Sequence, residues 1–194
     1  MALNKMTKYV IVFDLDECLC FWDEQNCISK NSSYYLRPFA RFLLRKLETH
    51  FKPNKYFPVL FSYGLRPYVM DVLNKFDILK YFKLVLTRKH CEISKGQYGA
   101  IKTFDYLIRR KEVRRFICVG SSVTLPVTII IDDKVRENTE NVVGGDFDLK
   151  ICVPEFNAVN IVNKINDRAL LDAYYRIVNY DLSSVGDHKP RIID

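Results

Sequence analysis

Two aspartates stand one residue apart at the end of an apolar run near the start of the chain. The run reads YVIVFDLDECLC over residues 9–20 and contains Asp14 and Asp16. Its apolar part is typical of a strand that is covered on both faces of a parallel sheet. Two carboxylates at the end of such a strand repel each other and lose hydration unless a divalent cation or a metal-bound phosphoryl group compensates them. A solvated acidic turn is the alternative, and the aspartate pair alone does not decide between the two.

Further polar residues follow two other apolar runs. YFPVLFS ends at Ser62, and VTIIIDD ends at Asp132 and Asp133. Ligands of parallel α/β sheets bind beyond the carboxyl ends of the strands. We therefore expect these side chains to form one site together with Asp14 and Asp16.

Such a set of residues suits phosphoryl transfer. Asp14 would attack phosphorus, because a carboxylate is already ionised and needs no activating base. Asp16 would protonate the leaving oxygen and later activate the attacking water. Mg²⁺ would bind Asp14 and Asp132, and we count Asp16 and Asp133 as further candidate ligands. Ser62 and a lysine would hold the phosphoryl oxygens on which charge develops.

The length and composition indicate one globular protein. With 194 residues the chain is predicted to form a single domain over residues 1–182, followed by a flexible tail over 183–194. No apolar run approaches a membrane span, and the N-terminus lacks the apolar segment of a signal peptide. We therefore expect no membrane association and an intracellular location, nuclear or cytoplasmic. The six cysteines are scattered without a C-x-x-C pair, so reduced thiols are expected.

Strand-like and helix-like segments alternate along the chain. Strands are expected at residues 9–14, 56–62, 82–87, 127–133 and 149–156. Helices are expected within residues 35–51, 65–76, 103–112 and 159–180. This alternation predicts βαβ units and a doubly wound, mainly parallel α/β sheet with helices on both faces.

Five segments in this order resemble those of a known family. FDLDECL resembles the D-x-D-x-[TV] motif of haloacid dehalogenase (HAD) superfamily phosphatases. More narrowly, it resembles the D-L-D-E-T-L of the FCP/SCP phosphatases, the NLI-interacting-factor-like family that acts on the C-terminal domain of RNA polymerase II. Later segments are similar to those of the same family, over about Tyr9 to Tyr175: YLRPFARFLL, PVLFSYGLRPYVMDVLNKFD, LTRKHCEISKGQY, IIIDDK and NDRALLDAYYRIV.

The resemblance implies a HAD-like Rossmannoid fold with a small insertion and no large cap. It also implies a Mg²⁺-dependent phosphatase that works through an aspartyl-phosphate intermediate, with phosphoserine or phosphothreonine proteins as substrates. The family pattern places a lysine near Ala100, and we assign this role to Lys102, with Lys95 as the alternative.

Three residues are assigned to the substrate side of the cleft by the same resemblance. Cys18 stands where the family has threonine, and it either packs beneath the loop or acts as a redox-sensitive thiol. Tyr63 follows Ser62, and Arg37 either contacts substrate or fixes the local fold. Phe39 replaces the glycine of the family's R-P-G segment, so the start of this helix is altered.

The net charge of +7 includes a basic run, RRKEVRR, at Arg109–Arg115. It lies in a stretch, residues 103–126, that is not matched to the family. The run would bind an acidic partner or nucleic acid, unless it is only a solvated helix face. Two alternative functions follow: a nucleic-acid 3′-phosphatase, or a catalytically weak or inactive scaffold that binds a phosphoprotein. The richness in Lys, Asn, Ile, Tyr and Phe suggests an A/T-rich genome and a large DNA virus as the source.

Overall fold

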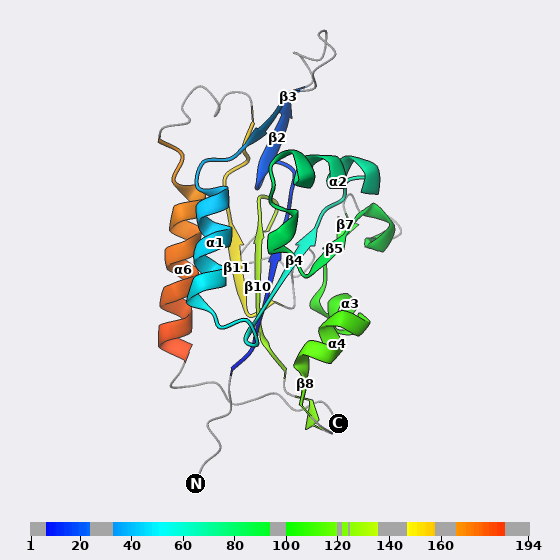
Figure 1. Cartoon of the computed structure of the whole chain (residues 1–194), viewed down its shortest axis with the longest axis vertical. Coiled ribbons are helices and arrows are strands. Elements are labelled where there is room, and N and C mark those ends of the chain that lie inside the picture. The colour runs from blue at the N-terminus through cyan, green and yellow to red at the C-terminus, as the bar shows by residue number, and fades with distance from the viewer. Residues whose placement is uncertain are drawn as a thin grey trace.

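A parallel sheet of five strands forms the centre of the protein (Figure 1). The computed structural model describes residues 7–23, 33–93, 100–119, 122–123, 125–135, 147–157 and 166–184. The strand order is β11-β10-β1-β4-β5, and every neighbouring pair is parallel. The strands are β1 (Tyr9–Phe13), β4 (Tyr56–Phe61), β5 (Leu84–Leu86), β10 (Val127–Asp132) and β11 (Leu149–Cys152). The predicted mainly parallel α/β sheet is therefore confirmed.

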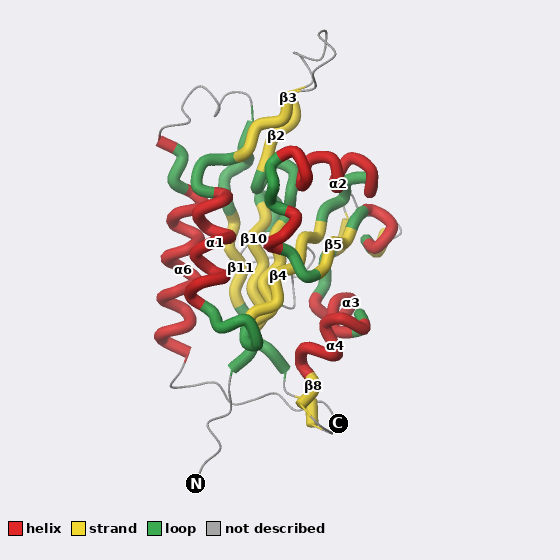
Figure 2. Tube along the Cα trace, in the orientation of Figure 1, coloured by secondary structure: helices red, strands yellow, loops and turns green. Residues whose placement is uncertain are grey.

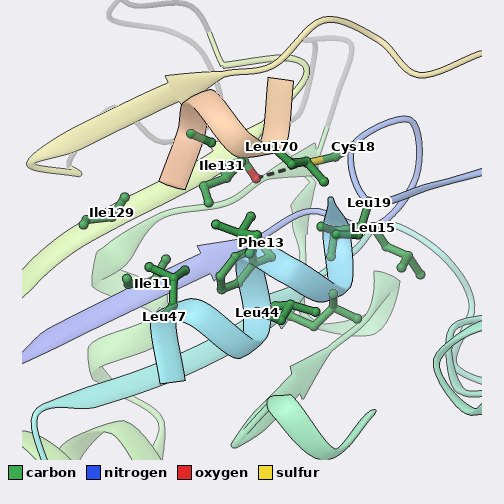
Figure 3. Packing of buried hydrophobic residues seen from close by; sticks show 14 of the residues in the cluster. Ile11, Phe13, Leu15, Cys18, Leu19, Leu44, Leu47, Ile129, Ile131 and Leu170 are labelled. Carbon is green, nitrogen blue, oxygen red and sulfur yellow. Dashed lines mark hydrogen bonds between the residues drawn. The ribbon is translucent and has the colours of Figure 1, made fainter. Parts of the chain in front are cut away.

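Helices cover both faces of this sheet. The side chains of Ile11 and Phe13 on β1 pack with α1 (Ala40–His50), α2 (Arg66–Lys75) and α6 (Ala169–Ser184). Val10 and Val12 point the opposite way and pack with α3 (Phe104–Ile108) and α4 (Lys111–Ile117). Figure 3 shows the first of these two cores, with Leu44 and Leu47 of α1 next to β1. The alternation of side chains along β1 thus supplies both cores and makes the sheet doubly wound.

The later strands are added on both sides of β1. The chain first builds β4 and β5 on one side of β1, then returns and adds β10 and β11 on the other side. The order of the strands therefore reverses between β1 and β10. In open parallel sheets this reversal opens a crevice at the carboxyl ends of the two strands, where ligands bind.

The remaining elements are short. β2 (Cys20–Asp23) and β3 (Ser33–Leu36) form an antiparallel pair that projects beyond the central sheet (Figure 2). Two 3-10 helices flank β5, namely η1 (Leu79–Tyr81) and η2 (Arg88–His90). Two small antiparallel pairs are β6 (Glu92–Ile93) with β7 (Ala100–Ile101), and β8 (Cys118–Val119) with β9 (Ser122–Val123). No large cap interrupts the part of the chain that the structure describes between Asp16 and Ser62.

Several element boundaries differ from those expected. The sequence predicts one helix over residues 103–112, but α3 ends at Ile108 and α4 begins at Lys111, so the basic run spans the break between two helices. The last strand ends at Cys152, and the final described helix begins at Ala169. Residues 158–165, where that helix was expected to start, and residues 185–194, most of the expected tail, lie outside the described residues.

The start of α1 explains why the family favours glycine there. Phe39 precedes the helix with φ of 63°, in the left-handed region that side chains other than glycine rarely adopt. Its ring lies against Phe42 with centroids 6.2 Å apart. The backbone turn is thus kept although the glycine is replaced. No helix in the described residues has the length and apolar composition needed to cross a membrane.

Candidate active site

The carboxyl ends of β1 and β10 bring two aspartates together. The strands pair in register, with Phe13 opposite Ile131, and the Asp14 N–H donates to the carbonyl of Ile131 at 3.0 Å. Asp14 and Asp132 are both buried, at 7% and 1% exposure. This is the crevice at the strand-order reversal, so two buried carboxylates lie at the point where the topology favours a ligand.

Lys102 lies between these two carboxylates. It follows β7 directly and is 5% exposed. Its Nζ donates to Asp14 Oδ1 at 2.5 Å and to Asp132 Oδ2 at 2.6 Å. Burial would lower the pKa of Lys102, but the two carboxylates outweigh it and raise that pKa above the ordinary value. Burial raises the pKa of Asp14, and the nearby ammonium opposes this effect. Lys102 is therefore the cation that makes buried carboxylates tolerable at this position.

A third carboxylate leaves the site with excess negative charge. Donor oxygens of Asp14, Asp132 and Asp133 all lie within 4.8 Å of one another. Oδ1 of Asp133 is buried and has no hydrogen-bond partner in the described part of the chain, and burial together with the Asp132 charge raises the Asp133 pKa to about 6. A hard divalent cation that prefers carboxylate oxygens, such as Mg²⁺, fits this set of donors. Three of the four expected metal ligands are thus gathered in one place.

The carboxylate of Asp16 has different neighbours. It accepts a hydrogen bond from Ser62 Oγ at 3.0 Å and another from the hydroxyl of Tyr68. Ser62 Oγ in turn accepts from the N–H of Gly64 at 2.8 Å. The side chain of Asp16 is therefore held by hydroxyl groups and lies outside the three-carboxylate group, which does not support its expected role as a side-chain metal ligand.

The family model for NLI interacting factor-like phosphatases matches residues 9–187. The chain belongs to this family. It is accordingly a phosphatase of the FCP/SCP type, a phosphoric monoester hydrolase. None of the curated proteins compared with it matches. Among solved structures, an uncharacterized protein from Listeria monocytogenes serotype 4b matches at 14% identity, over 81% of this chain and 96% of that chain, with a TM-score of 0.43. That likeness is too distant to bear on function.

Two residues that the sequence assigns to substrate binding lie inside this phosphatase. Cys18 is completely buried, and its Sγ donates to the carbonyl of Ile131 at 3.7 Å (Figure 3). Burial raises the pKa of this thiol well above its usual range, so it remains protonated. Arg37 is only 2% exposed. The structure therefore supports packing for Cys18 and a structural role for Arg37.

Arg37 joins the loop after β1 to the start of α6. Its Nε donates to Asp167 Oδ2 at 2.8 Å, and its Nη1 donates to the carbonyl of Cys18 at 3.2 Å. Asp167 also accepts from the N–H of Ala169 at 3.1 Å. The same loop contains Glu17, whose φ of 60° is unusual for a residue other than glycine. The ion pair thus helps to fix the strained loop that follows Asp14 and contains Asp16.

Tyr63 lies on the open side of the site. It is 45% exposed, its carbonyl accepts from Arg88 Nε at 2.9 Å, and its ring lies under the Arg88 guanidinium at 4.7 Å. This position is compatible with contact to a substrate. Lys95, the alternative to Lys102, lies outside the described residues.

Two polar residues of the phosphatase were missed from the sequence. Tyr68 bonds to Asp16 across 52 positions, and Asp167 bonds to Arg37 across 130 positions. For Tyr68 one signal was available: a tyrosine on an otherwise apolar helix face needs a partner for its hydroxyl. Asp167 gave no comparable signal, because an aspartate ahead of a helix is explained by helix capping alone.

Proposed function

We propose that this phosphatase is Mg²⁺-dependent, forms an aspartyl-phosphate on Asp14, and acts on phosphoserine or phosphothreonine in proteins. The observation that carries the proposal is the contrast between Asp14 and Asp16. Asp14 lies with Lys102 and the other carboxylates, whereas Asp16 is held by Ser62 and a tyrosine hydroxyl. Two carboxylates with such different surroundings suit the two different roles of nucleophile and acid–base group.

In the first step an oxygen of Asp14 attacks phosphorus, and the bond between phosphorus and the serine or threonine oxygen breaks. Asp16 gives its proton to that leaving oxygen. The ammonium of Lys102, beside Asp14, stabilises the negative charge on the phosphoryl oxygens. When Mg²⁺ is bound by Asp14, Asp132 and Asp133, its charge offsets the repulsion between these carboxylates and the phosphoryl group.

In the second step water attacks the phosphorus of the aspartyl-phosphate. Asp16, now ionised, takes a proton from this water, and the bond between phosphorus and the Asp14 oxygen breaks. Inorganic phosphate leaves, and both aspartates return to their starting states. The hydroxyls of Ser62 and Tyr68 keep the Asp16 carboxylate oriented in both steps.

A protein substrate is favoured by the absence of a large cap in the described residues between Asp16 and Ser62. An uncovered site admits a peptide segment more readily than it encloses a small metabolite. The nucleic-acid 3′-phosphatase is the second candidate, and the basic run at Arg109–Arg115 is the observation that favours it. The family assignment and the separate settings of Asp14 and Asp16 argue against an inactive scaffold.

The test is hydrolysis of p-nitrophenyl phosphate with Mg²⁺, with EDTA, and in the Asp14→Asn and Asp16→Asn variants. We expect turnover that needs the metal and is lost in Asp14→Asn. In Asp16→Asn we expect kcat to fall about 100- to 10,000-fold, because hydrolysis of the aspartyl-phosphate needs Asp16 as the base even when the leaving group is nitrophenolate. Acid quenching during turnover of a ³²P-labelled phosphopeptide should trap phosphate on Asp14. Full activity in EDTA or in Asp14→Asn would refute this mechanism. A comparison of phosphopeptides with 3′-phosphorylated oligonucleotides then identifies the substrate class.

A further inference from the structure

The positive charge of the chain is concentrated in one stretch. Residues 88–115 contain nine lysines and arginines against three aspartates and glutamates, whereas the other 166 residues contain 21 against 20. Almost all of the net charge of +7 therefore comes from the segment that runs from the end of β5 to α4. Charge gathered in this way creates a local field that attracts anions to one side of the molecule.

Three cations from separate segments act electrostatically on one histidine of this stretch. Arg66 is the first residue of α2, Lys89 belongs to η2, and Arg110 lies between α3 and α4. Burial lowers the pKa of His90, and Arg110, Lys89 and Arg66 lower it further. Among the described residues, the three charges that act most strongly on this imidazole are all positive, which indicates a cluster of cations.

Other cations of the same stretch are held by carboxylate or backbone partners, whereas Arg110 is held by a tyrosine. Arg109 pairs with Asp105, and Arg88 is bonded to the backbone of the loop after Ser62. Arg110 lies over the ring of Tyr106 with its carbon Cζ 5.6 Å from the centroid, and its Nη1 donates to the Tyr106 hydroxyl at 3.3 Å. Its Nε is buried and has no hydrogen-bond partner among the described residues. The tyrosine therefore holds this guanidinium in place without neutralising its charge, and its terminal N–H groups can bind an anion.

The cluster adjoins the active site on the side of Ser62. Arg66 comes four residues after Ser62. The 3-10 helix η2 is bonded to the intervening loop, because the N–H of Arg88 donates to the carbonyl of Gly64 at 3.0 Å. Cys91, just after η2, donates through Sγ to the carbonyl of Ser62 at 3.9 Å. An anionic group bound by the cluster would therefore sit beside a substrate whose phosphate occupies the site.

We propose that Arg66, Lys89 and Arg110 form a second anion-binding subsite, which holds another phosphate or carboxylate of the substrate polypeptide. The preferred substrate is then a multiply phosphorylated or acidic segment. This inference rests on the proposed function, because the subsite assists a peptide already bound at Asp14.

The path of the basic run favours a polypeptide over nucleic acid. The carbonyl of Phe116, at the end of α4, accepts from Nζ of Lys8, which lies just before β1. The run therefore leads from the cluster toward the amino ends of the strands, away from the active site. Only a compact group of cations remains beside the cleft, and it suits one additional anionic group better than a long phosphate backbone.

The test uses phosphoserine peptides that carry serine, aspartate or a second phosphoserine at one other position. That other position is placed two to five residues from the first phosphoserine, on either side. The wild type, R66Q/K89Q and R114Q/R115Q are compared by kcat/KM, and p-nitrophenyl phosphate reports the chemistry independently. R114Q/R115Q is the matched control, because it removes the same charge from exposed positions further along α4. Thermal unfolding checks that both variants are folded.

We expect the wild type to prefer the doubly phosphorylated peptide by about three- to tenfold at low salt, which corresponds to two surface ion pairs. The preference should disappear in R66Q/K89Q, persist in R114Q/R115Q, and weaken at high salt. An equal loss in both variants would show a general charge effect and overturn the subsite. Equal turnover of all peptides by the wild type would overturn the subsite while leaving the phosphatase proposal intact. Faster turnover of a 3′-phosphorylated oligonucleotide, with the largest loss in R66Q/K89Q, would assign the cluster to nucleic acid instead.

Discussion

Two buried ion pairs lie on either side of the loop that follows β1, and they differ in how well their charges balance. Arg37 faces Asp167, one cation against one anion, at 2.8 Å. Lys102 faces Asp14 and Asp132 at 2.5 and 2.6 Å, so one cation serves two anions. The first pair is complete within the protein. The second has negative charge left over.

The carboxylate of Asp133 adds to the surplus negative charge around Lys102. Among the described residues, Oδ1 of Asp133 has no hydrogen-bond partner, and the cation nearest to its other oxygen is Nζ of Lys134 at 4.0 Å. Leaving a charge uncompensated in the interior costs stability. A buried pair whose charges cancel suits a structural role. A buried group with surplus negative charge favours binding of a cation. The contrast therefore separates the residues that hold the fold from those that do the chemistry.

The largest expected effect comes from Asp14→Asn. Loss of the nucleophile should lower kcat by at least about 10,000-fold. Stability should stay equal or increase, because the change removes one of the mutually repelling carboxylates. Steady-state kinetics and urea unfolding measure the two quantities on the same sample. A variant that loses stability along with its activity would contradict the view that this site carries surplus negative charge.

Arg37→Met should show the opposite pattern. Removal of one partner leaves Asp167 largely buried and unpaired, which costs about 3–5 kcal/mol in the free energy of unfolding. The kcat per folded molecule should change much less than in Asp14→Asn. Arg41→Met is the matched control, because Arg41 is exposed and donates only to the carbonyl of Phe76. If both arginine variants unfold at the same urea concentration, the pair with Asp167 has no special structural role.

The sequence reveals the strand ends but not the contacts across the sheet. Asp14, Ser62, Asp132 and Asp133 each follow an apolar run, and parallel strands align such ends at one edge. The expectation of one shared edge is therefore simple to derive. The assignment of Lys102 required the family pattern, which places the lysine near Ala100, and a shift of two residues from it. In the structure Ala100 belongs to the short strand β7, and Lys102 directly follows that strand.

The contacts that spacing could not predict join segments far apart in the chain. Tyr68 meets Asp16 because α2 packs over the loop after β1, and no local pattern describes that packing. The basic run at Arg109–Arg115 was predicted as one surface feature, but Arg109 and Arg110 lie in a break between two helices and the rest of the run lies in α4. Its association with Arg66 and Lys89 depends on how η2 meets α2, which is a property of the fold rather than of any segment.

Added Mg²⁺ should stabilise the phosphatase by binding the surplus carboxylates. At a concentration about 100 times its Kd, the ion should raise the free energy of unfolding by about 2.7 kcal/mol. Asp133→Asn should lose most of this gain, because it removes a charged ligand, whereas Arg37→Met should keep it. Thermal unfolding with and without Mg²⁺ measures the gain without relying on catalysis. An undiminished gain in Asp133→Asn would place the ion elsewhere.

The smallest effect is expected from Tyr68→Phe, which removes one of the two hydroxyls that hold Asp16. A single hydrogen bond of this kind is worth about 1 kcal/mol, so kcat should fall about fivefold. The loss in kcat/KM, which reports the first step, should be greater for a phosphoserine peptide than for p-nitrophenyl phosphate, because nitrophenolate leaves readily and needs little help from the general acid.

Tyr34→Phe provides the control for this change. Tyr34 packs against Tyr68 with ring centroids 5.9 Å apart, so the variant removes a neighbouring hydroxyl while the hydrogen bond to Asp16 is retained. Its kcat should remain close to that of the wild type on both substrates. An equal loss in kcat/KM on both substrates in Tyr68→Phe would mean that the hydroxyl supports packing at the edge of the site. A loss confined to the phosphoserine peptide would assign the Tyr68 hydroxyl to the proton transfer made by Asp16. The residues that do the chemistry would then include Tyr68 as well as the buried carboxylates.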